Sequence, residues 1–354
     1  MDSLVEIDFV EVTVIVDNEL DPMSPCPPDT VQVTGGPVPL VAMQTGKHVA
    51  PGERGRAEDT IIEVPMNHLC CSAHGLSLMV TAVKGDLRRT ILFDTGPEED
   101  VWERNARRLR LDLSEIDVIQ LSHWHRDHSG GMLRAIRMIK EAKERNGQSN
   151  HDLIVDLHPD RPDYRGFSMG DKIISLEADP TFDEITAAGA TVQKHDKAHT
   201  VLDDMFLISG QIRRQTPYET GLHSAVRYVK EDNEWVSDEK IEDERLLACH
   251  VKDKGLVVFT GCSHAGVVNA TKHSMELLRG KVPVYAIVGG YHLATSDESV
   301  IESTVRDLWR LDPAVLMPGH CTGWRAKFAI EKKMPGQMVP CTVGTRFVIG
   351  CEQH

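Results

Sequence analysis

The segment His123-Trp-His125-Arg-Asp127-His128 places four metal-competent side chains within six residues. Imidazole and carboxylate groups suit Zn²⁺, and also iron or Mn²⁺. Two histidines separated by one residue, directly after a strand, can point both rings into one pocket and hold one ion. Asp127 and His128 follow at once and can reach a second position nearby. The spacing therefore predicts a site for one or two transition-metal ions, with zinc as the first choice. The alternative is a hydrogen-bonded surface turn.

Four apolar runs that look like buried strands end in a small turn followed by a histidine. These histidines are His123, His264, His292 and His320. In open α/β sheets, ligands bind at the carboxyl ends of the strands, where loops carry side chains into a crevice. We therefore expect the four histidines to gather at one sheet edge. The pattern gives His292 no ligand role, so it is predicted to donate a hydrogen bond to substrate or to act as a general acid. His74 is a weaker candidate for the same pocket.

Period-two and helical apolar patterns predict the elements that position these residues. Strands are predicted at residues 3–16, 75–83, 90–93, 117–121, 153–157, 172–176, 206–208, 225–229, 246–250, 256–260, 282–288, 314–317 and 345–349, and helices from about 97 and at 132–143, 266–279, 298–310 and 323–333. This alternation indicates an α/β fold with helices packed outside sheet. The stretches 18–60 and 210–245 are predicted to be irregular excursions, and the charge run 231–245 a solvated loop.

The composition excludes several classes of protein. The 354 residues include 39 Lys and Arg against 54 Asp and Glu, which gives a net charge of −15. This sign argues against binding to nucleic acid or to an anionic membrane surface. No apolar run approaches the ~20 residues of a membrane span, and the acidic N-terminus lacks the features of a signal peptide. The eight cysteines contain no CxxC pair and are predicted to be reduced. We expect one cytoplasmic domain, residues 1–354, that acts on a small molecule; the sequence does not indicate the oligomeric state.

Longer motifs surround the histidine cluster. LSHWHRDHSGG, with FDTG at Phe93–Gly96 upstream, resembles the metallo-β-lactamase superfamily. The chain is more narrowly similar to the dihydropterin-ribofuranosyl-aminobenzene-phosphate synthase-like branch. Further matching motifs are VDNE (16–19), AHGLSL (73–78), DERLL (243–247), FTGCSHAGVVN (259–269), GGYHL (289–293) and PGHCTG (318–323). The resemblance thus extends over almost the whole chain, and it implies a four-layer αβ/βα sandwich with the metals at one edge between two sheets.

The resemblance also implies roles for particular residues. It implies two ligand sets, which are His123, His125 and His264 for the first ion and Asp127, His128 and His320 for the second. Asp94 of FDTG would support the ligand loops from behind. Cys262 stands where many members carry an aspartate that bridges both ions. Its thiolate would bridge them, or it is a buried thiol, and the number of ions depends on which.

A metal-dependent hydrolase explains these residues best. Zinc lowers the pKa of bound water to ~7, and Asp127 would orient the resulting hydroxide. Asp127 and His292 are therefore the predicted catalytic residues. The predicted substrate is a small cyclic amide or ester, such as a lactam or lactone, including a foreign metabolite that the cell detoxifies.

Other activities are alternatives. The first is the pterin-pathway synthase or transferase chemistry of the branch, and the second is a phosphodiesterase. The sequence shows neither a Gly-rich phosphate cradle nor an obvious Arg or Lys fork for these substrates. A serine hydrolase built on Ser263 would leave the histidine cluster unexplained, and an inactive binding module would leave all six ligand positions unexplained. The remaining histidines are predicted to be surface or structural residues: His48, His68, His151, His158, His195, His199, His223, His250, His273 and His354.

Overall fold

Alternating apolar side chains give the central strands two buried faces. In the strand Phe9–Val16, Val10 and Val12 face one apolar core, whereas Ile15 faces another. The strand Ser77–Lys84 repeats this pattern, with Val80 in the first core and Met79 in the second. Because successive strand residues point to opposite faces, a sheet of such strands needs a layer packed on each side.

The first large sheet contains eight strands. The computed structural model describes residues 4–50, 52–148 and 151–350. Within them the strands of this sheet are β2 (Phe9–Val16), β3 (Gln32–Gly35), β6 (Ser77–Lys84), β7 (Leu87–Phe93), β8 (Ile116–Gln120), β9 (Ile154–Leu157), β12 (Thr191–Lys194) and β21 (Arg346–Gly350). Their order is β12-β9-β8-β7-β6-β2-β21-β3. The parallel pairs β7–β8 and β8–β9 bring the carboxyl ends of these strands to one edge.

The second large sheet contains seven strands. They are β1 (Glu6–Ile7), β13 (Lys197–Val201), β14 (Phe206–Gly210), β17 (Leu247–Val251), β18 (Gly255–Thr260), β19 (Val284–Gly290) and β20 (Val315–Gly319). The order is β13-β14-β17-β18-β19-β20, and β1 pairs with β17. The strands β18, β19 and β20 are parallel, so their carboxyl ends also share an edge. One apolar core lies between the two sheets and contains side chains of both.

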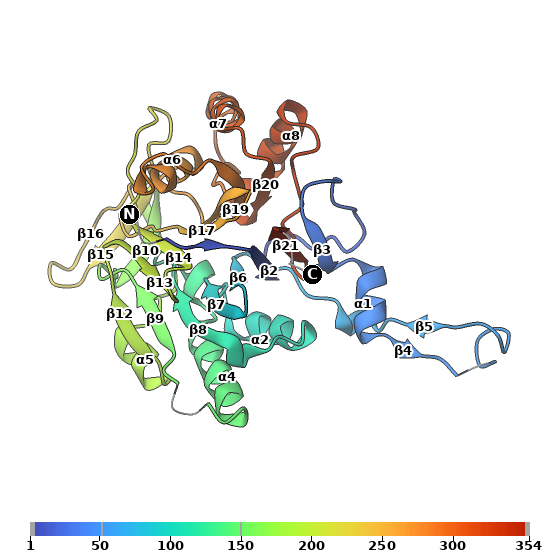
Figure 1. Ribbon diagram of the computed structural model, residues 1–354. Coiled ribbons are helices and arrows are strands. Elements are labelled where there is room, and N and C mark those ends of the chain that lie inside the picture. The colour runs from blue at the N-terminus through green and yellow to red at the C-terminus, as the bar shows by residue number, and fades with distance from the viewer. Residues whose placement is uncertain (1–3, 51, 149–150, 351–354) are drawn as a thin grey trace.

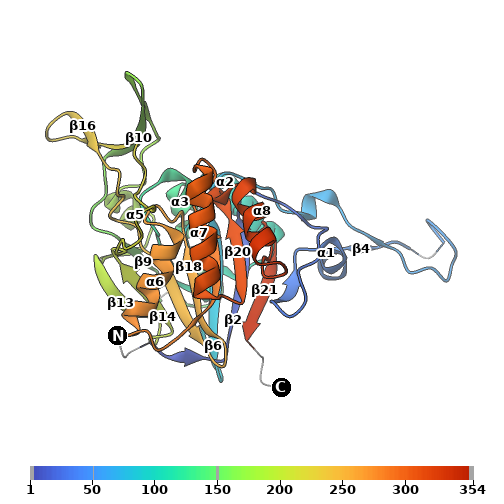
Figure 2. The same ribbon diagram turned by 90° about the horizontal axis from the view of Figure 1, so that it is seen from above.

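Helices cover the outer faces of both sheets. They are α2 (Glu99–Arg108), α4 (Met132–Arg145) and α5 (Phe182–Ala187) on the first sheet, and α6 (Val267–Leu277), α7 (Glu298–Leu311) and α8 (Trp324–Lys333) on the second. The short elements are α3 (Arg126–Ser129), η1 (Met66–His68), η2 (Leu113–Glu115) and η3 (His320–Thr322). Figures 1 and 2 show the helix–sheet–sheet–helix order. The αβ/βα sandwich expected from the resemblance is confirmed.

The prediction of two irregular excursions is wrong in part. Residues 18–60 contain β3, α1 (Val38–Thr45) and β4 (Lys47–His48), which pairs with β5 (Ile62–Glu63). The elements α1, β4 and β5 form an arm that extends from the body (Figure 1). Residues 210–245 contain β15 (Ala225–Val229), which was predicted, and β16 (Glu234–Ser237), which was not. These two strands join β10 (Tyr164–Met169) and β11 (Lys172–Ser175) in a small separate sheet. The Pro and Gly residues between 18 and 60, and the charged residues around β16, concealed the patterns of these elements in the sequence.

The charge run 231–245 is not solvated throughout. Asp243, Glu244 and Arg245 at its end are all buried. The guanidinium of Arg245 donates to Asp156 Oδ1 at 2.5 Å and to the Leu121 carbonyl at 2.8 Å. The run therefore ends inside the protein, directly behind the loop that follows β8.

Candidate metal centre

The candidate site residues lie in loops that leave the carboxyl ends of five strands. Asp94 follows β7, His123 follows β8, and the Cys262–His264 turn follows β18. His292 and His320 follow β19 and β20. The two large sheets thus contribute side chains to one place, as the four strand-ending histidines led us to expect.

Three imidazoles form the first ligand group. His123 Nε2 lies 2.9 Å from His125 Nδ1, and His264 Nε2 lies 3.2 Å from each of them. All three side chains are buried. Burial lowers the pKa of His125 to about 3 and those of His123 and His264 well below their ordinary value, and neighbouring positive groups add to the effect. Three neutral rings therefore face one another at close range.

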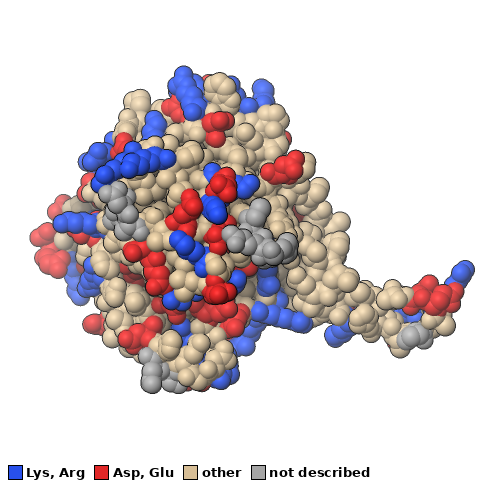
Figure 3. All heavy atoms as spheres, viewed as in Figure 1, with Lys and Arg blue, Asp and Glu red and all other residues tan. Residues whose placement is uncertain are grey.

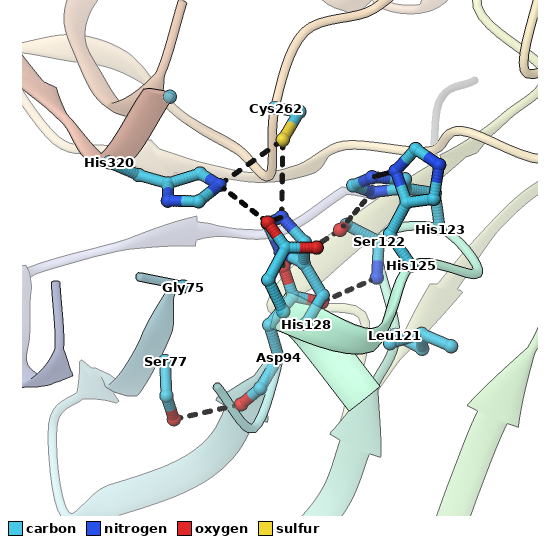
Figure 4. Close-up of polar contacts among 12 residues, drawn as sticks. Gly75, Ser77, Asp94, Leu121, Ser122, His123, His125, His128, Cys262 and His320 are labelled. Atoms are coloured by element: carbon cyan, nitrogen blue, oxygen red, sulfur yellow. Dashed lines mark hydrogen bonds and ion pairs between the residues drawn. The ribbon is translucent and has the colours of Figure 1, made fainter. Parts of the chain in front are cut away.

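Four side chains of three chemical types form the second group. His128 Nε2 and His320 Nε2 lie 3.2 and 3.3 Å from Cys262 Sγ. Asp127 Oδ2 lies 3.2 Å from His320 Nε2 and 3.6 Å from His128 Nε2. Figure 4 shows these contacts around Cys262. Asp127 is the most accessible of the four, with a side chain that is 21% exposed.

Cys262 lies between the two groups. Its sulfur is within 4.8 Å of the ligand atoms of the second group, and also of those of His123 and His264. Burial raises the pKa of the Cys262 thiol well above its usual value. A thiol in this position becomes a thiolate when it coordinates a cation. The sulfur therefore lies within reach of both ligand groups.

Asp94 and Ser122 fix the ring nitrogens that face the site. Asp94 Oδ1 accepts a hydrogen bond from the Ser122 backbone at 2.7 Å. Asp94 Oδ2 accepts from the Ser122 hydroxyl at 2.7 Å and from His128 Nδ1 at 2.6 Å. Because the Ser122 hydroxyl donates its hydrogen bond to Asp94, the Ser122 oxygen accepts a hydrogen bond from His123 Nδ1 at 2.9 Å. Both rings therefore keep a proton on Nδ1 and turn Nε2 toward the site (Figure 4).

Carboxylates control the charge of His128. Burial alone would lower its pKa, but Asp127 and Asp94 outweigh that effect and raise the pKa to about 9. Burial would raise the pKa of Asp127, but its contacts with His128 and His320 hold that pKa well below its usual range. The second group therefore contains charged side chains, while the rings of the first group are neutral. The two groups would favour a cation by different means.

The arrangement fits metal ions by its chemistry. In the triangle of His123, His125 and His264, three neutral rings cannot all be satisfied by hydrogen bonds to one another. The His264 ring turns Nε2 toward this triangle, and its other nitrogen, Nδ1, has no hydrogen-bond partner in the described residues. The three nitrogens lie 2.9–3.2 Å apart, close enough for one ion to contact all of them at the usual zinc–nitrogen distance of about 2.0–2.1 Å. The residues present therefore fit a divalent ion.

Backbone strain gathers at the site. Asp94, Ser263, His292 and His320 all have positive φ angles, of 58°, 66°, 47° and 46°. Non-glycine residues in this region cost on the order of 1–3 kcal/mol each and persist where the surroundings enforce them. The carboxyl ends of β7, β18, β19 and β20 thus turn sharply at the residues that enter the site.

Several supporting residues were not predicted from the sequence. Asp17 Oδ2 accepts the His320 backbone N–H at 3.0 Å, and Asn18 Oδ1 lies 3.0 Å from His320 Nδ1. Glu244 accepts the backbone N–H groups of His264 and Ala265, each at 2.7 Å. These residues belong to VDNE and DERLL, motifs that were noted for the resemblance without a role. Their position within these motifs was the only feature of the sequence that could have indicated a role at the site.

Arg165 on β10 supports the site but belongs to none of the motifs identified in the sequence. Its guanidinium binds Asp243 at 2.5 Å, Asp238 at 2.8 Å and the Trp124 carbonyl at 2.7 Å. Asp243 in turn accepts the Trp124 backbone N–H at 2.8 Å. This buried ion pair joins the small sheet to the histidine loop. Trp124 itself packs in the core under the helices rather than lining the site.

His292 and His74 flank the two ligand groups. The His292 ring centroid lies 4.4 Å from that of His264, and its Nδ1 has no hydrogen-bond partner in the described chain. His74 Nε2 lies 3.5 Å from Asp127 Oδ2, and its side chain is 71% exposed. Both candidates are therefore placed beside the site. Ser263 is buried, and its hydroxyl donates to the Gly290 carbonyl at 2.7 Å, an arrangement unsuited to a serine nucleophile.

Two of the histidines predicted to be structural form a separate group. His195 Nδ1 and His199 Nε2 lie 2.7 and 2.9 Å from the same oxygen of Asp156. Asp156 belongs to β9 of the first sheet, and His199 to β13 of the second. The group thus links the two large sheets at one end of each. His354 lies outside the described residues.

Comparisons with known proteins agree with this geometry. Residues 77–141 match the family model of the Metallo-beta-lactamase superfamily. The 7,8-dihydropterin-6-methyl-4-(beta-D-ribofuranosyl)-aminobenzene-5'-phosphate synthase of Methanocaldococcus jannaschii is 29% identical over 264 residues, which cover 72% of this chain and 83% of that protein. The resemblance seen in the sequence motifs is confirmed.

Solved structures show the same fold. A metal-dependent hydrolase of the beta-lactamase superfamily matches with a TM-score of 0.64 and 21% identity, over 97% of this chain and 100% of that one. The metallo-beta-lactamase fold protein YhfI from Bacillus subtilis matches with a TM-score of 0.50 and 12% identity, over 97% and 100% of the two chains. None of the helices in the described residues is long and apolar enough to cross a membrane.

Proposed function

We propose that this protein, which has the metallo-β-lactamase fold, is a metal-dependent hydrolase of a small cyclic amide or ester. The observation that carries the proposal is the convergence of six imidazole and carboxylate ligands, with Cys262 between them, at the shared edge of two sheets. A divalent ion held there would polarise a substrate oxygen and lower the pKa of a water molecule from ~15.7 to ~7.

The two ligand groups suit different tasks. We assign His123, His125 and His264 to the first ion and Asp127, His128 and His320 to the second. The first group adds no negative charge, because its rings are neutral. It therefore leaves the Lewis acidity of a bound ion undiminished. The second group adds the charge of Asp127 and, on coordination, that of Cys262. We assign zinc to both positions, since tetrahedral sites of nitrogen, oxygen and sulfur ligands suit it best.

Residues of the chain would supply the proton transfers. Asp127 is the accessible carboxylate of the site, and its Oδ2 faces both His320 and the exposed His74. It is placed to accept a hydrogen bond from a water molecule and to orient it toward a substrate carbonyl. His292 lies beside the neutral first group, with Nδ1 unpaired. We assign it the donation of a proton to the leaving atom as the carbonyl–heteroatom bond breaks.

A cyclic amide or ester fits this arrangement. Attack on the carbonyl develops negative charge on its oxygen, which a neighbouring cation stabilises. Ring opening leaves both product ends in one molecule, so neither end leaves before the proton transfer is complete. A lactam or lactone is therefore the proposed substrate, and removal of a foreign metabolite in the cytoplasm the proposed role.

The synthase relative favours a second candidate function. Identity of 29% over most of both chains makes a related pterin-pathway reaction the main alternative. A phosphodiesterase reaction on the same ligands is the other. These reactions act on phosphate esters or their precursors, whereas the proposed hydrolase acts on an uncharged carbonyl. The two classes can be separated by substrate.

Metal analysis and a substrate panel together test the proposal. Elemental analysis of protein purified without chelator should find one to two equivalents of zinc. His123→Ala should remove the first equivalent, whereas His223→Ala, which changes an exposed histidine outside the site, should retain the metal. Steady-state assays should then show turnover of lactones or lactams. Efficient phosphodiester cleavage without turnover of any cyclic amide or ester would overturn the substrate choice, and well under one equivalent of metal would overturn the mechanism.

A further inference from the structure

A cavity of about 340 Å³ lies where the arm meets the body of the protein. Its lining includes the apolar Val41, Leu69 and Val343 and the basic Arg108, Arg110 and Arg346. None of its lining residues is a proposed metal ligand, and none is acidic. The lining therefore combines apolar side chains with three arginines in a chain whose net charge is −15.

The three arginines come from two distant parts of the sequence. Arg108 ends α2, Arg110 follows it, and Arg346 begins β21. Each guanidinium donates to a backbone carbonyl: Arg108 to Leu69 at 2.6 Å, Arg110 to Gln44 at 3.3 Å, and Arg346 to Leu109. These bonds hold the guanidinium groups in place around the cavity. Arg108 Nη1 also donates to Cys71 Sγ at 3.0 Å. Each arginine thus uses a single terminal nitrogen, and its other nitrogens remain available to a ligand.

The cavity has no internal counter-charge. Across the described ranges, no carboxylate oxygen lies within 4.0 Å of Arg108, Arg110 or Arg346, although many other arginines of the protein are paired in this way. Burial lowers the pKa of Arg346, because its charged form has lost solvent. Basic side chains also gather on the surface beside the root of the arm (Figure 3). Three positive side chains around one cavity, without a carboxylate partner among the described residues, favour the binding of an anion.

We infer that this cavity binds a small organic anion, with its phosphate or carboxylate group on the three arginines and an apolar body against the aliphatic lining. Guanidinium groups match the planar and tetrahedral oxyanions through paired hydrogen bonds. Val41, Leu69 and Val343 supply the apolar contact. The inference is independent of the proposed function, because it uses no residue of the metal centre.

Calorimetric titration of the full chain tests this site directly. The probes are phenyl phosphate, benzoate, inorganic phosphate and the neutral benzyl alcohol, at low ionic strength. Every titration is repeated after the protein has been treated with chelator, so that anion binding at the metal centre is removed. We expect phenyl phosphate or benzoate to bind in both conditions, inorganic phosphate more weakly, and benzyl alcohol not at all. Whichever of the two aromatic anions binds more tightly shows whether the site prefers a phosphate or a carboxylate group.

Arginine variants locate the binding. Arg110→Met and Arg346→Met should each weaken binding at least about tenfold, since each removes a charge-assisted hydrogen bond. The matched control is Arg107→Met, an exposed neighbour paired with Glu103 outside the cavity, which should bind as the wild type does. Arg110 is itself exposed, so its variant should fold. Absence of anion binding, or binding that both cavity variants retain, would overturn the inference. Binding that disappears only with the metal would assign the anion to the metal centre.

Discussion

Replacement of Asp94 by asparagine tests how the metal centre is organised. The carboxylate accepts hydrogen bonds from the Ser122 backbone, the Ser122 hydroxyl and His128 Nδ1. In Asp94→Asn the amide oxygen can retain the backbone bond, but the amide nitrogen would face His128. That nitrogen is a donor, so His128 would have to accept on Nδ1 and carry its proton on Nε2. A protonated Nε2 cannot ligate a cation, and the second ligand group would lose His128.

The size of the effect follows from the bonds that change. Two hydrogen bonds to a charged acceptor are lost, each worth about 1.5–3 kcal/mol. Loss of a carboxylate partner of a ligand histidine typically lowers metal affinity 10–100-fold. We therefore expect the second zinc equivalent to bind 10–100-fold more weakly. The first should change less, because the Ser122 oxygen can still accept from His123 Nδ1.

Competitive titration with a chromophoric zinc chelator measures both affinities. Asp112→Asn is the matched control, because Asp112 accepts from the backbone and hydroxyl of Ser114 in the same way but lies outside the site. Urea unfolding in the presence of chelator checks that both variants fold. If Asp94→Asn bound both equivalents within twofold of the wild type, the proposed control of the His128 tautomer would be refuted.

Three further predictions address catalysis, folding and pH. Asp127→Ala should lower kcat about 10²–10⁴-fold in metal-loaded protein with an unchanged circular dichroism spectrum; near-normal turnover would show that another group orients the water. Arg165→Met should lower the free energy of unfolding by about 3–5 kcal/mol, because it leaves Asp243 buried and unpaired; a loss below 1 kcal/mol in urea titrations would contradict this. Burial lowers the pKa of His199, but its hydrogen bond to Asp156 outweighs that effect and raises the pKa above 6.5. The contribution of His199 to folding stability is therefore full below pH 6.5 and is lost as the pH rises through the folded-state pKa. The stability difference between wild type and His199→Gln should therefore shrink from about pH 5.5 to 8.5, and a constant difference would exclude this linkage.

Local sequence was sufficient where one element supplies the chemistry. The strand, turn and helix around His123–His128 are contiguous, so residue spacing alone predicted a shared pocket. The strands that lead to His264 and His320 are likewise apolar runs that end in small turns, and their parallel pairing brings the ends together. The assignment of ligands to two groups needed the resemblance, because spacing does not say which distant histidine completes which group. These ligand roles remain predictions.

Sequence was insufficient where a side chain acts across elements. Arg165 lies in a strand that was not predicted, and its partner Asp243 lies in a charge run that was predicted to be solvated. Nothing within either segment indicates that the two residues meet. Likewise, irregular composition in residues 18–60 concealed α1 and the β4–β5 pair. Charge runs and Pro-rich stretches indicate loops only when no distant element buries them, and that condition is a tertiary one.

The net charge of the chain likewise does not determine which ligand a cavity can bind. The acidic composition argues against nucleic acid and anionic membranes as partners, and the sequence shows no obvious Arg or Lys fork for a phosphate. Yet Arg108, Arg110 and Arg346 line one cavity that has no acidic residue. The field at a binding site depends on charges within about a Debye length, roughly 10 Å, rather than on the sum over the chain. The acidic groups that set the total charge therefore do not exclude an anionic ligand here, and direct titration of the cavity can decide the question that composition left open.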